Sequence, residues 1–187
     1  MPLNWREVIE FFSGHVTREQ AISEFFTATF SASEGADEGK VIGDLVRDLM
    51  ETTPSKDLFV WSAYDDQMFL GCIFLSRLAY AEDDRTVFIL SPVAVRTDRQ
   101  KNGIGQKLIA YGVDDLRQKG IDFVLTYGDP NYYSKTGFRQ ITEEFAQAPL
   151  KLSLPEGWLG QSLSDKDERP LSGPSRCVPA LNNPELW

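Results

Sequence analysis

The sequence predicts a single α+β domain, and three observations support this prediction. Residues 58–78 have the pattern of two strands joined by a tight turn, which is typical of an antiparallel hairpin. Residues 86–127 have the pattern of strand, helix and strand, and such a unit forms a right-handed parallel crossover. The chain has 187 residues, 42% of them hydrophobic, which suffices for one well-formed core and is short for two domains.

Two helices are expected in the N-terminal part of the chain. Thr17 to Gln20 has the form of a capping box, and apolar residues follow at helical spacing to about Phe30. A second helix is expected from Ala36 to Leu49, because its apolar residues recur every three or four positions and share one face. The preceding segment, Trp5 to Phe12, fits either a strand or a short helix.

The expected strands are rich in aromatic and β-branched residues, and they comprise residues 58–64, 68–78, 86–95 and 121–127. The crossover helix runs from Ile104 to a basic last turn before Gly120. Asp129 is placed to cap a short helix that begins at Pro130 and ends at Gly137. Ligands of such units lie at the carboxyl ends of the strands, so we expect a site where this short helix approaches the start of the crossover helix.

The chain changes character at Pro149. Six of the ten prolines lie in residues 149–187, yet Trp158 and Trp187 are costly to leave exposed. We therefore expect residues 1–148 to form the main domain and residues 149–187 to form a proline-rich extension docked on it. The aromatic side chains of this extension either complete the core or form a homodimer surface.

Charge and composition narrow the function. The net charge of −9 disfavours nucleic acid as a partner, because such binding depends on Lys and Arg neutralising phosphates. The same charge serves solubility or attracts cationic small molecules and basic peptides. Only two cysteines are present, no metal-binding cluster is visible, and the first thirty residues contain no long hydrophobic run. We expect a cytoplasmic protein that neither spans a membrane nor binds a metal.

The segment from Val93 to Gly105 predicts a phosphate site. An apolar strand leads through a basic turn into a helix that opens on two glycines. The first N–H groups of a helix lack intrahelical partners and lie at its positive end, where they favour an anion. Gly103 and Gly105 carry no Cβ and therefore permit close approach. In the alternative interpretation, the glycines only shape the turn from strand to helix.

Other glycine-rich loops fit this segment poorly. A P-loop requires a hydroxyl residue after its lysine, and none follows Lys107. A dinucleotide-binding fingerprint requires a third glycine, and position 108 is leucine. A histidine-dependent hydrolase would depend on His15, the single histidine, which lies in an ordinary polar turn.

Two motifs in this order resemble the GNAT superfamily of acyl-CoA N-acyltransferases. Gln100 to Gly105 resembles the family's (Arg/Gln)-x-x-Gly-x-(Gly/Ala) loop, and Asp129 to Phe138 resembles its Tyr-x-x-x-Gly-Phe segment in the Gly-Asp-Pro-x-Tyr-Tyr form of one bacterial subgroup. The resemblance covers residues 17–141. It implies a mixed, mostly antiparallel central sheet flanked by helices, with parallel strands splayed at the cofactor site, and acetyl-CoA as co-substrate.

The resemblance also implies roles for individual residues. Tyr133 stands four residues before Gly137, at the family's general-acid position, and a phenol can protonate a departing thiolate. In the alternative interpretation, Tyr133 only lines the pocket. The cofactor-binding residues implied are Val93, Ala94 and Val95 for the pantetheine arm, Gln100, Lys101, Asn102, Gly103, Ile104 and Gly105 for the pyrophosphate, Arg99 or Lys101 for the outer phosphate, and Asn131. A general base is not apparent, because residues 86–95 contain no carboxylate.

The function implied is N-acetyl transfer from acetyl-CoA to a primary amine of a small molecule, peptide or protein, by direct attack in a ternary complex. One alternative is a non-catalytic acyl-CoA-binding or regulatory module, which the missing strand carboxylate favours. Another is an acetyltransferase acting on aminoacyl-tRNA, which conflicts with the acidic charge of the chain.

Overall fold

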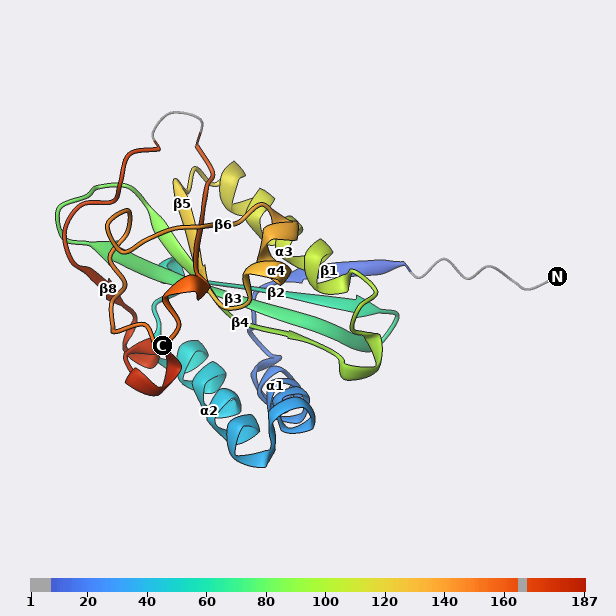
Figure 1. Cartoon of the computed structure of the whole chain (residues 1–187). Coiled ribbons are helices and arrows are strands. Elements are labelled where there is room, and N and C mark those ends of the chain that lie inside the picture. Colours follow the sequence, from blue (N-terminus) through green and yellow to red (C-terminus); the bar gives the residue numbers. More distant parts are fainter. Residues whose placement is uncertain (1–7, 165–167) are drawn as a thin grey trace.

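The computed structural model describes residues 8–164 and 168–187. Its centre is an eight-stranded mixed sheet with the order β1-β2-β3-β4-β5-β7-β6, and β8 pairs with β3 (Figure 1). The strands are β1 (Ile9–Ser13), β2 (Leu58–Asp65), β3 (Met68–Tyr80), β4 (Val87–Val95), β5 (Phe123–Tyr127), β6 (Arg139–Gln140), β7 (Trp158–Ser162) and β8 (Ser175–Cys177). All neighbouring strands are antiparallel except β4 and β5, which are parallel. The predicted α+β class and mostly antiparallel sheet are therefore confirmed.

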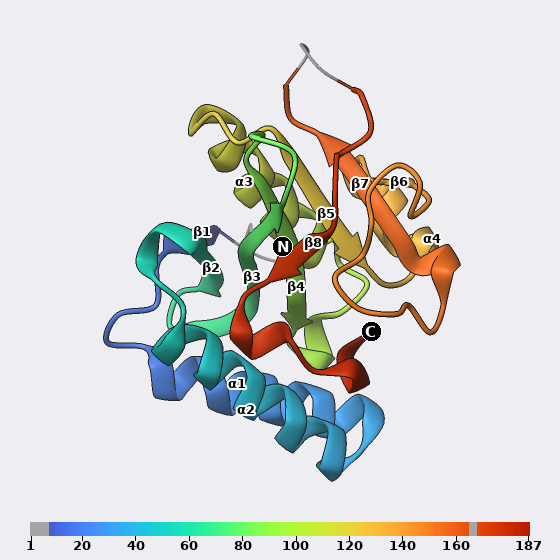
Figure 2. The same ribbon diagram turned by 90° about the vertical axis from the view of Figure 1, so that its left-hand side faces the viewer.

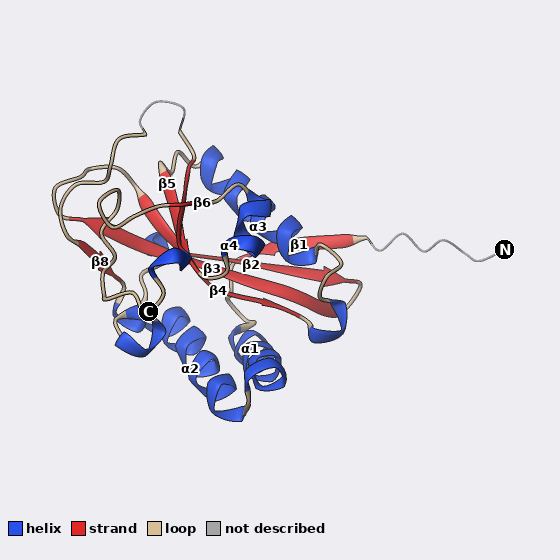
Figure 3. Ribbon diagram, in the orientation of Figure 1, coloured by secondary structure: helices blue, strands red, loops and turns tan. Residues whose placement is uncertain are grey.

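Helices cover both faces of the sheet (Figure 3). The helices α1 (Glu19–Glu34) and α2 (Ala36–Thr52) lie on one face, and α3 (Ile104–Gln118) and α4 (Pro130–Tyr133) lie on the other. Each face has its own hydrophobic core. Phe26 of α1 and Leu49 of α2 are buried in one core, and Leu108 and Ile109 of α3 are buried in the other. The apolar stripes of α2 and α3 thus face the sheet, as their helical spacing predicts.

The parallel pair separates halfway along β4. Residues 87–90 of β4 pair with residues 123–126 of β5, and pairing on that side ends there. The Thr126 hydroxyl donates a hydrogen bond to the Leu90 carbonyl at the last rung, at 2.8 Å. Beyond it, Ser91 and Pro92 together face the single residue Phe74 of β3, which is a β-bulge. A bulge accommodates proline in a central strand. On the side of β4 that faces away from β3, residues 91–95 pair with none of the described strands and form an open edge.

The C-terminal part of the chain joins the same sheet. β7 lies between β5 and β6, and β8 continues the sheet beside the end of β3 (Figure 2). Trp158 and Trp187 are both buried, and their indole rings pack against each other at 6.1 Å. The indole N–H groups donate to the carbonyls of Ala146 and Leu181 respectively. Residues 149–187 thus supply one inserted strand and one edge strand.

The expected capping box at the first helix is wrong. Thr17 has a φ of 70°, and Arg18, which occupies the N-cap position of α1, makes no side-chain capping bond. A hydroxyl cap requires extended backbone at the capping residue, and the left-handed turn at Thr17 prevents it. The helix itself is present and extends to Glu34. Of the ambiguous segment Trp5 to Phe12, the part from Ile9 onward is strand β1, and Trp5 lies outside the described residues.

Candidate functional site

A cavity of about 990 Å³ opens at the carboxyl ends of β4 and β5. Its wall is made by the end of α1, the start of α2, the open edge of β4, the first turn of α3, α4 and the C-terminal 3-10 helix Pro184–Leu186. Elements from both faces of the sheet therefore meet where β4 and β5 diverge. Cavities of this size are typical of ligand sites.

The glycine turn forms one end of this cavity. Gly103 is the N-cap of α3 and adopts the left-handed conformation, with a φ of 76°, and Lys101 is also left-handed. The first intrahelical bond runs from the Lys107 N–H to the Gly103 carbonyl, so the N–H groups of residues 104–106 precede it and lack intrahelical acceptors. Lys101 and Lys135 also line the cavity. This end of the cavity has the donors and charge that bind an anion.

The sequence-predicted cofactor residues divide into two groups. Those that line the cavity are Val93, Val95, Gln100, Lys101, Gly103, Ile104 and Gly105. Those outside its lining are Ala94, Arg99, Asn102 and Asn131. Ala94 is buried and pairs with Cys72 of β3, so only its backbone can face a ligand.

Two members of the second group have structural contacts. The Arg99 guanidinium lies 3.8 Å from the Met68 sulfur, and the Asn131 N–H donates to the Asp129 carboxylate at 2.9 Å. The latter bond is the helix cap predicted for Asp129. In the first group, the Gln100 amide donates to the Val95 carbonyl at 3.1 Å and so ties the glycine turn to the end of β4.

Tyr133 also lines this cavity. Its ring packs against the backbone of Gly128, where a Cβ would lie 2.7 Å from a ring carbon, and edge-on to Phe138 at 5.9 Å. Burial raises the pKa of Tyr133 above its ordinary value, and hydrogen bonding with Thr126 opposes this shift. The phenol is therefore protonated throughout the neutral range and can donate a proton.

Three carboxylates line the opposite end of the cavity. They belong to Glu34 at the end of α1, Glu38 in the first turn of α2 and Glu185 near the C-terminus. No ion pair joins any of them to a residue that the structure describes. No local sequence pattern predicts that these three carboxylates gather at one cavity, since the residues lie far apart in the chain. The cavity thus carries positive charge at the glycine turn and negative charge where α1, α2 and the C-terminal 3-10 helix meet it.

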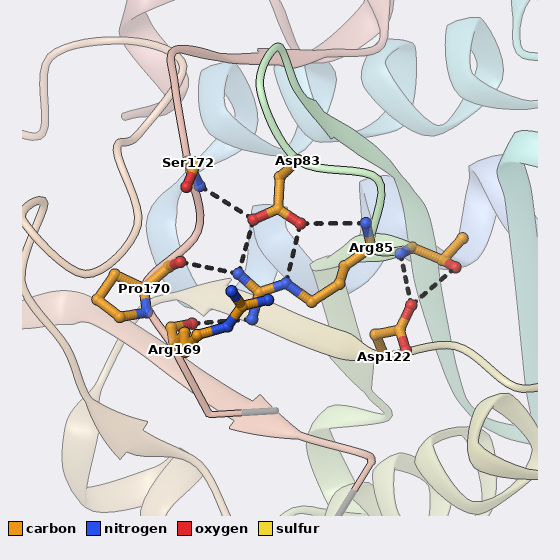
Figure 4. Close-up of polar contacts among 7 residues, drawn as sticks. Asp83, Arg85, Asp122, Arg169, Pro170 and Ser172 are labelled. Carbon is orange, nitrogen blue, oxygen red and sulfur yellow. Dashed lines mark hydrogen bonds and ion pairs between the residues drawn. The ribbon is translucent and has the colours of Figure 1, made fainter. Parts of the chain in front are cut away.

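A second acidic group, Glu82 to Asp84, lies in the loop between β3 and β4, at the other end of the strands. Asp83 forms an ion pair with Arg85 at 2.6 Å and accepts a hydrogen bond from the Ser172 N–H (Figure 4). Arg85 also donates to the Arg169 and Pro170 carbonyls. This cluster ties the loop to the C-terminal part of the chain and contributes nothing to the large cavity.

Comparisons with known proteins agree with this architecture. The family model described as an acetyltransferase (GNAT) domain matches residues 56–140. The uncharacterized N-acetyltransferase YjhQ of Escherichia coli strain K12 is 28% identical in an alignment of length 139 that covers 71% of this chain and 76% of YjhQ. None of the helices in the described part of the chain has the length and apolar character that a membrane span requires.

Two crystal structures share the fold. The GNAT-family N-acetyltransferase YhbS from Escherichia coli, in complex with CoA, has a TM-score of 0.76 and 22% identity, covering 94% of this chain and 92% of that chain. A GNAT-family acetyltransferase from Brucella melitensis, in complex with acetyl-CoA, has a TM-score of 0.72 and 22% identity, covering 94% and 99% of the two chains. Residues 56–140 thus match a GNAT acetyltransferase domain, and the whole chain has the fold of these two GNAT-family structures.

Proposed function

We propose that this GNAT enzyme transfers the acetyl group of acetyl-CoA to a primary amine of a small molecule or peptide by direct attack in a ternary complex. One observation carries the proposal: the glycine turn and Tyr133 line a single cavity beside the open edge of β4. The co-substrate would supply an acetyl thioester. The amine nitrogen would form a C–N bond to the acetyl carbonyl carbon, the C–S bond would break, and CoA would leave as the thiolate. We expect this reaction in the cytoplasm.

The glycine-turn end of the cavity fits the phosphates of acetyl-CoA. Backbone N–H groups of Ile104 and Gly105 lack intrahelical acceptors there, and the ammonium group of Lys101 adds positive charge. The open edge of β4 at residues 93–95 fits the amide groups of a pantetheine arm, which can pair with a strand edge as an additional strand does. Arg99 or Lys101 would meet the outer phosphate.

Tyr133 would hold the proton that the departing thiolate receives. Its raised pKa keeps the phenol protonated before the reaction and makes it a weaker acid, so the transfer would depend on its position beside the forming thiolate. No carboxylate stands on β4, so the amine would lose its proton through water to the carboxylates at the far end of the cavity. Glu38 is half-buried whereas Glu34 and Glu185 are exposed, and we take Glu38 as the candidate acceptor of this proton.

The carboxylates also favour one class of acceptor. Glu34, Glu38 and Glu185 would attract an amine that carries a second cationic group, because unlike charges at the wall of a cavity raise the local concentration of such a molecule. A diamine or a lysine-containing peptide has this chemistry. The experiment that tests the function is CoA release from acetyl-CoA, measured with a panel of mono- and diamines.

Binding of the co-substrate is tested separately by thermal shift. A ligand that binds only the folded protein raises its melting temperature by mass action. We expect acetyl-CoA and CoA to give a saturable rise and NAD to give none. The absence of a rise with both CoA species would contradict the proposed function.

Tyr133→Phe tests the proton donor. We expect kcat to fall by roughly ten- to a thousandfold while the Kd for acetyl-CoA is unchanged, since only the hydroxyl is removed. Tyr111→Phe is the matched control, because Tyr111 is 44% exposed on α3 and lies outside the cavity lining. Unchanged turnover in Tyr133→Phe would leave this tyrosine as a wall residue.

Glu38→Gln tests the acceptor end of the cavity. We expect the KM for a diamine to rise about three- to tenfold at low salt and by less at high salt, because salt screens a charge that is partly open to solvent. Glu51→Gln on the same helix, outside the cavity lining, is the control. If the KM of a diamine and that of a monoamine rose equally, charge recognition at this end would be refuted.

A further inference from the structure

The two glycines of the turn have different surroundings. A Cβ at Gly103 would meet nothing within 4 Å, and the residue is left-handed, so its backbone conformation explains the glycine. Gly105 lies in the first turn of α3, where backbone conformation makes no such demand. A Cβ at Gly105 would overlap the hydroxyl of Tyr132 and would lie 3.0 Å from a Val95 methyl. The space beside Gly105 is therefore occupied by a side chain of this protein.

Tyr132 connects that space to the proposed proton donor. Its ring meets the ring of Tyr133 edge-on, with centroids 5.0 Å apart and an interplanar angle of 86°. Tyr133 is held on its other sides by Phe138 and by the backbone of Gly128. A displacement of the Tyr132 ring would therefore be transmitted to Tyr133, because closely packed rings cannot move independently.

We propose that Tyr132 is a positioning residue: its hydroxyl fills the space left by Gly105 and thereby sets Tyr133 relative to the first turn of α3. This inference rests on the proposed function, in which the first turn of α3 holds the phosphates and Tyr133 protonates the thiolate. The adjacent tyrosines thus have separate tasks, since Tyr132 contacts the phosphate-binding turn and Tyr133 faces the reacting atoms. On this proposal Gly105 is required for the fit of Tyr132, and the ligand depends on the backbone N–H groups of the turn and not on the missing Cβ.

A double-mutant cycle that adds a methyl group at Gly105 and removes the hydroxyl of Tyr132 tests the proposal. Gly105→Ala introduces a methyl group that displaces the Tyr132 ring, and we expect kcat to fall about tenfold or more. Tyr132→Phe removes only the hydroxyl. We expect kcat to fall about threefold, because the ring remains but no longer has a hydroxyl in contact with Gly105. In the double variant the new methyl group occupies the vacated space. We expect its kcat to exceed that of Gly105→Ala by about fivefold or more, which is a coupling that independent sites do not show.

The division between kcat and KM separates this role from a structural one. We expect the KM and Kd for acetyl-CoA to stay within about threefold of wild type in all three variants, since the backbone donors of the turn are unchanged. A raised Kd in Gly105→Ala that Tyr132→Phe does not reverse would show that the glycine serves the ligand alone, and would overturn the proposal. Wild-type kcat in Gly105→Ala, or purely additive losses in the double variant, would overturn it as well.

Further measurements keep the proposal falsifiable. Should Gly105→Ala fail to fold, Tyr132→Ala removes both ring and hydroxyl, and kcat is expected to fall about tenfold with an unchanged Kd for acetyl-CoA. Unaltered kcat in folded Tyr132→Ala would refute the positioning role. Failure of the proposed function is distinguishable, because wild-type protein would then show no thermal shift with acetyl-CoA or no amine-stimulated CoA release.

Discussion

Asp83 and Arg85 form the most buried ion pair among the described residues, with side chains 8% and 9% exposed. The Asp83 carboxylate accepts hydrogen bonds from the Arg85 side chain, the Arg85 N–H and the Ser172 N–H. Its hydrogen bonds with Arg85 outweigh desolvation and lower the pKa of Asp83 to about 2. Because both oxygens of this carboxylate have partners, the pair can stabilise the fold despite its burial.

This pair predicts an acid-sensitive contribution to stability. The pKa of Asp83 is lower in the folded than in the unfolded chain, so the contribution is complete above about pH 4 and is lost as the pH falls toward 2. A depression from 3.8 to about 2 corresponds to about 2 kcal/mol. We expect Asp83→Asn to lower the free energy of unfolding by about this amount at pH 7 and by less at pH 3, measured by urea denaturation.

Asp84→Asn is the control for that prediction, because Asp84 is the exposed neighbour in the same loop. An equal loss of stability in Asp83→Asn at pH 7 and pH 3 would mean that the carboxylate acts through packing and not through its charge.

At the scale of elements, the α1–α2 hairpin shows close packing through glycine. A Cβ at Gly39 would overlap the Ser31 hydroxyl and would lie 2.6 Å from the Thr27 carbonyl oxygen, so the helix backbones approach closely there. The Ser23 hydroxyl adds a hydrogen bond to the Gly43 carbonyl at 2.9 Å. Glu34 and Glu38 stand where the two helices meet, and the packing of the hairpin thereby sets the acidic end of the cavity.

Gly39→Ala tests this packing. Alanine has a higher helix propensity than glycine by about 1 kcal/mol, but the backbone of α1 would have to move away, at a cost of about 1–3 kcal/mol. We expect a net loss of stability in thermal unfolding and a raised KM for the amine, with the KM for acetyl-CoA unchanged. Asp48→Ala, at an exposed position of α2, is the control. A more stable Gly39→Ala variant would show that the helices can separate freely.

At the scale of the whole molecule, the C-terminal part of the chain completes the cavity. Trp187 stacks on Tyr127 with centroids 6.2 Å apart, and Tyr127 itself lines the cavity. The Tyr127 hydroxyl accepts a hydrogen bond from the Leu154 N–H at 2.7 Å. Glu185 and Leu186 line the cavity, and the adjacent Trp187 is buried against Tyr127 and holds this end of the chain in place. The acidic end of the cavity is therefore built from segments outside residues 56–140.

Trp187→Ala tests that dependence. Removing a buried indole typically costs about 3–5 kcal/mol, and we expect a loss of about 3 kcal/mol with a several-fold rise in the KM for the amine. Leu154→Ala, where the side chain is 60% exposed, is the control in the same region. If Trp187→Ala lost stability while the KM for the amine stayed constant, the C-terminal residues would support the fold without contributing to acceptor binding.

Local patterns in the sequence predicted those features that adjacent residues determine. The hairpin around Asp66, the glycine turn at Gly103 and the Asp129 cap depend on conformations or hydrogen bonds within a few residues, and all are present. The exception at this scale is Thr17, whose capping pattern was overridden by a left-handed backbone. A short pattern cannot reveal which of two local conformations the rest of the fold will favour.

The sequence by itself therefore determined the order of elements, the two motifs that resemble GNAT enzymes and the glycine turn that opens α3, because these depend on short-range spacing. The tertiary structure alone decided that β7 enters the sheet between β5 and β6, that Glu34, Glu38 and Glu185 share one cavity, and that Tyr132 fills the space at Gly105. The physical reason is that these contacts join residues distant in the chain, and packing between such residues leaves no periodic or local trace in the sequence.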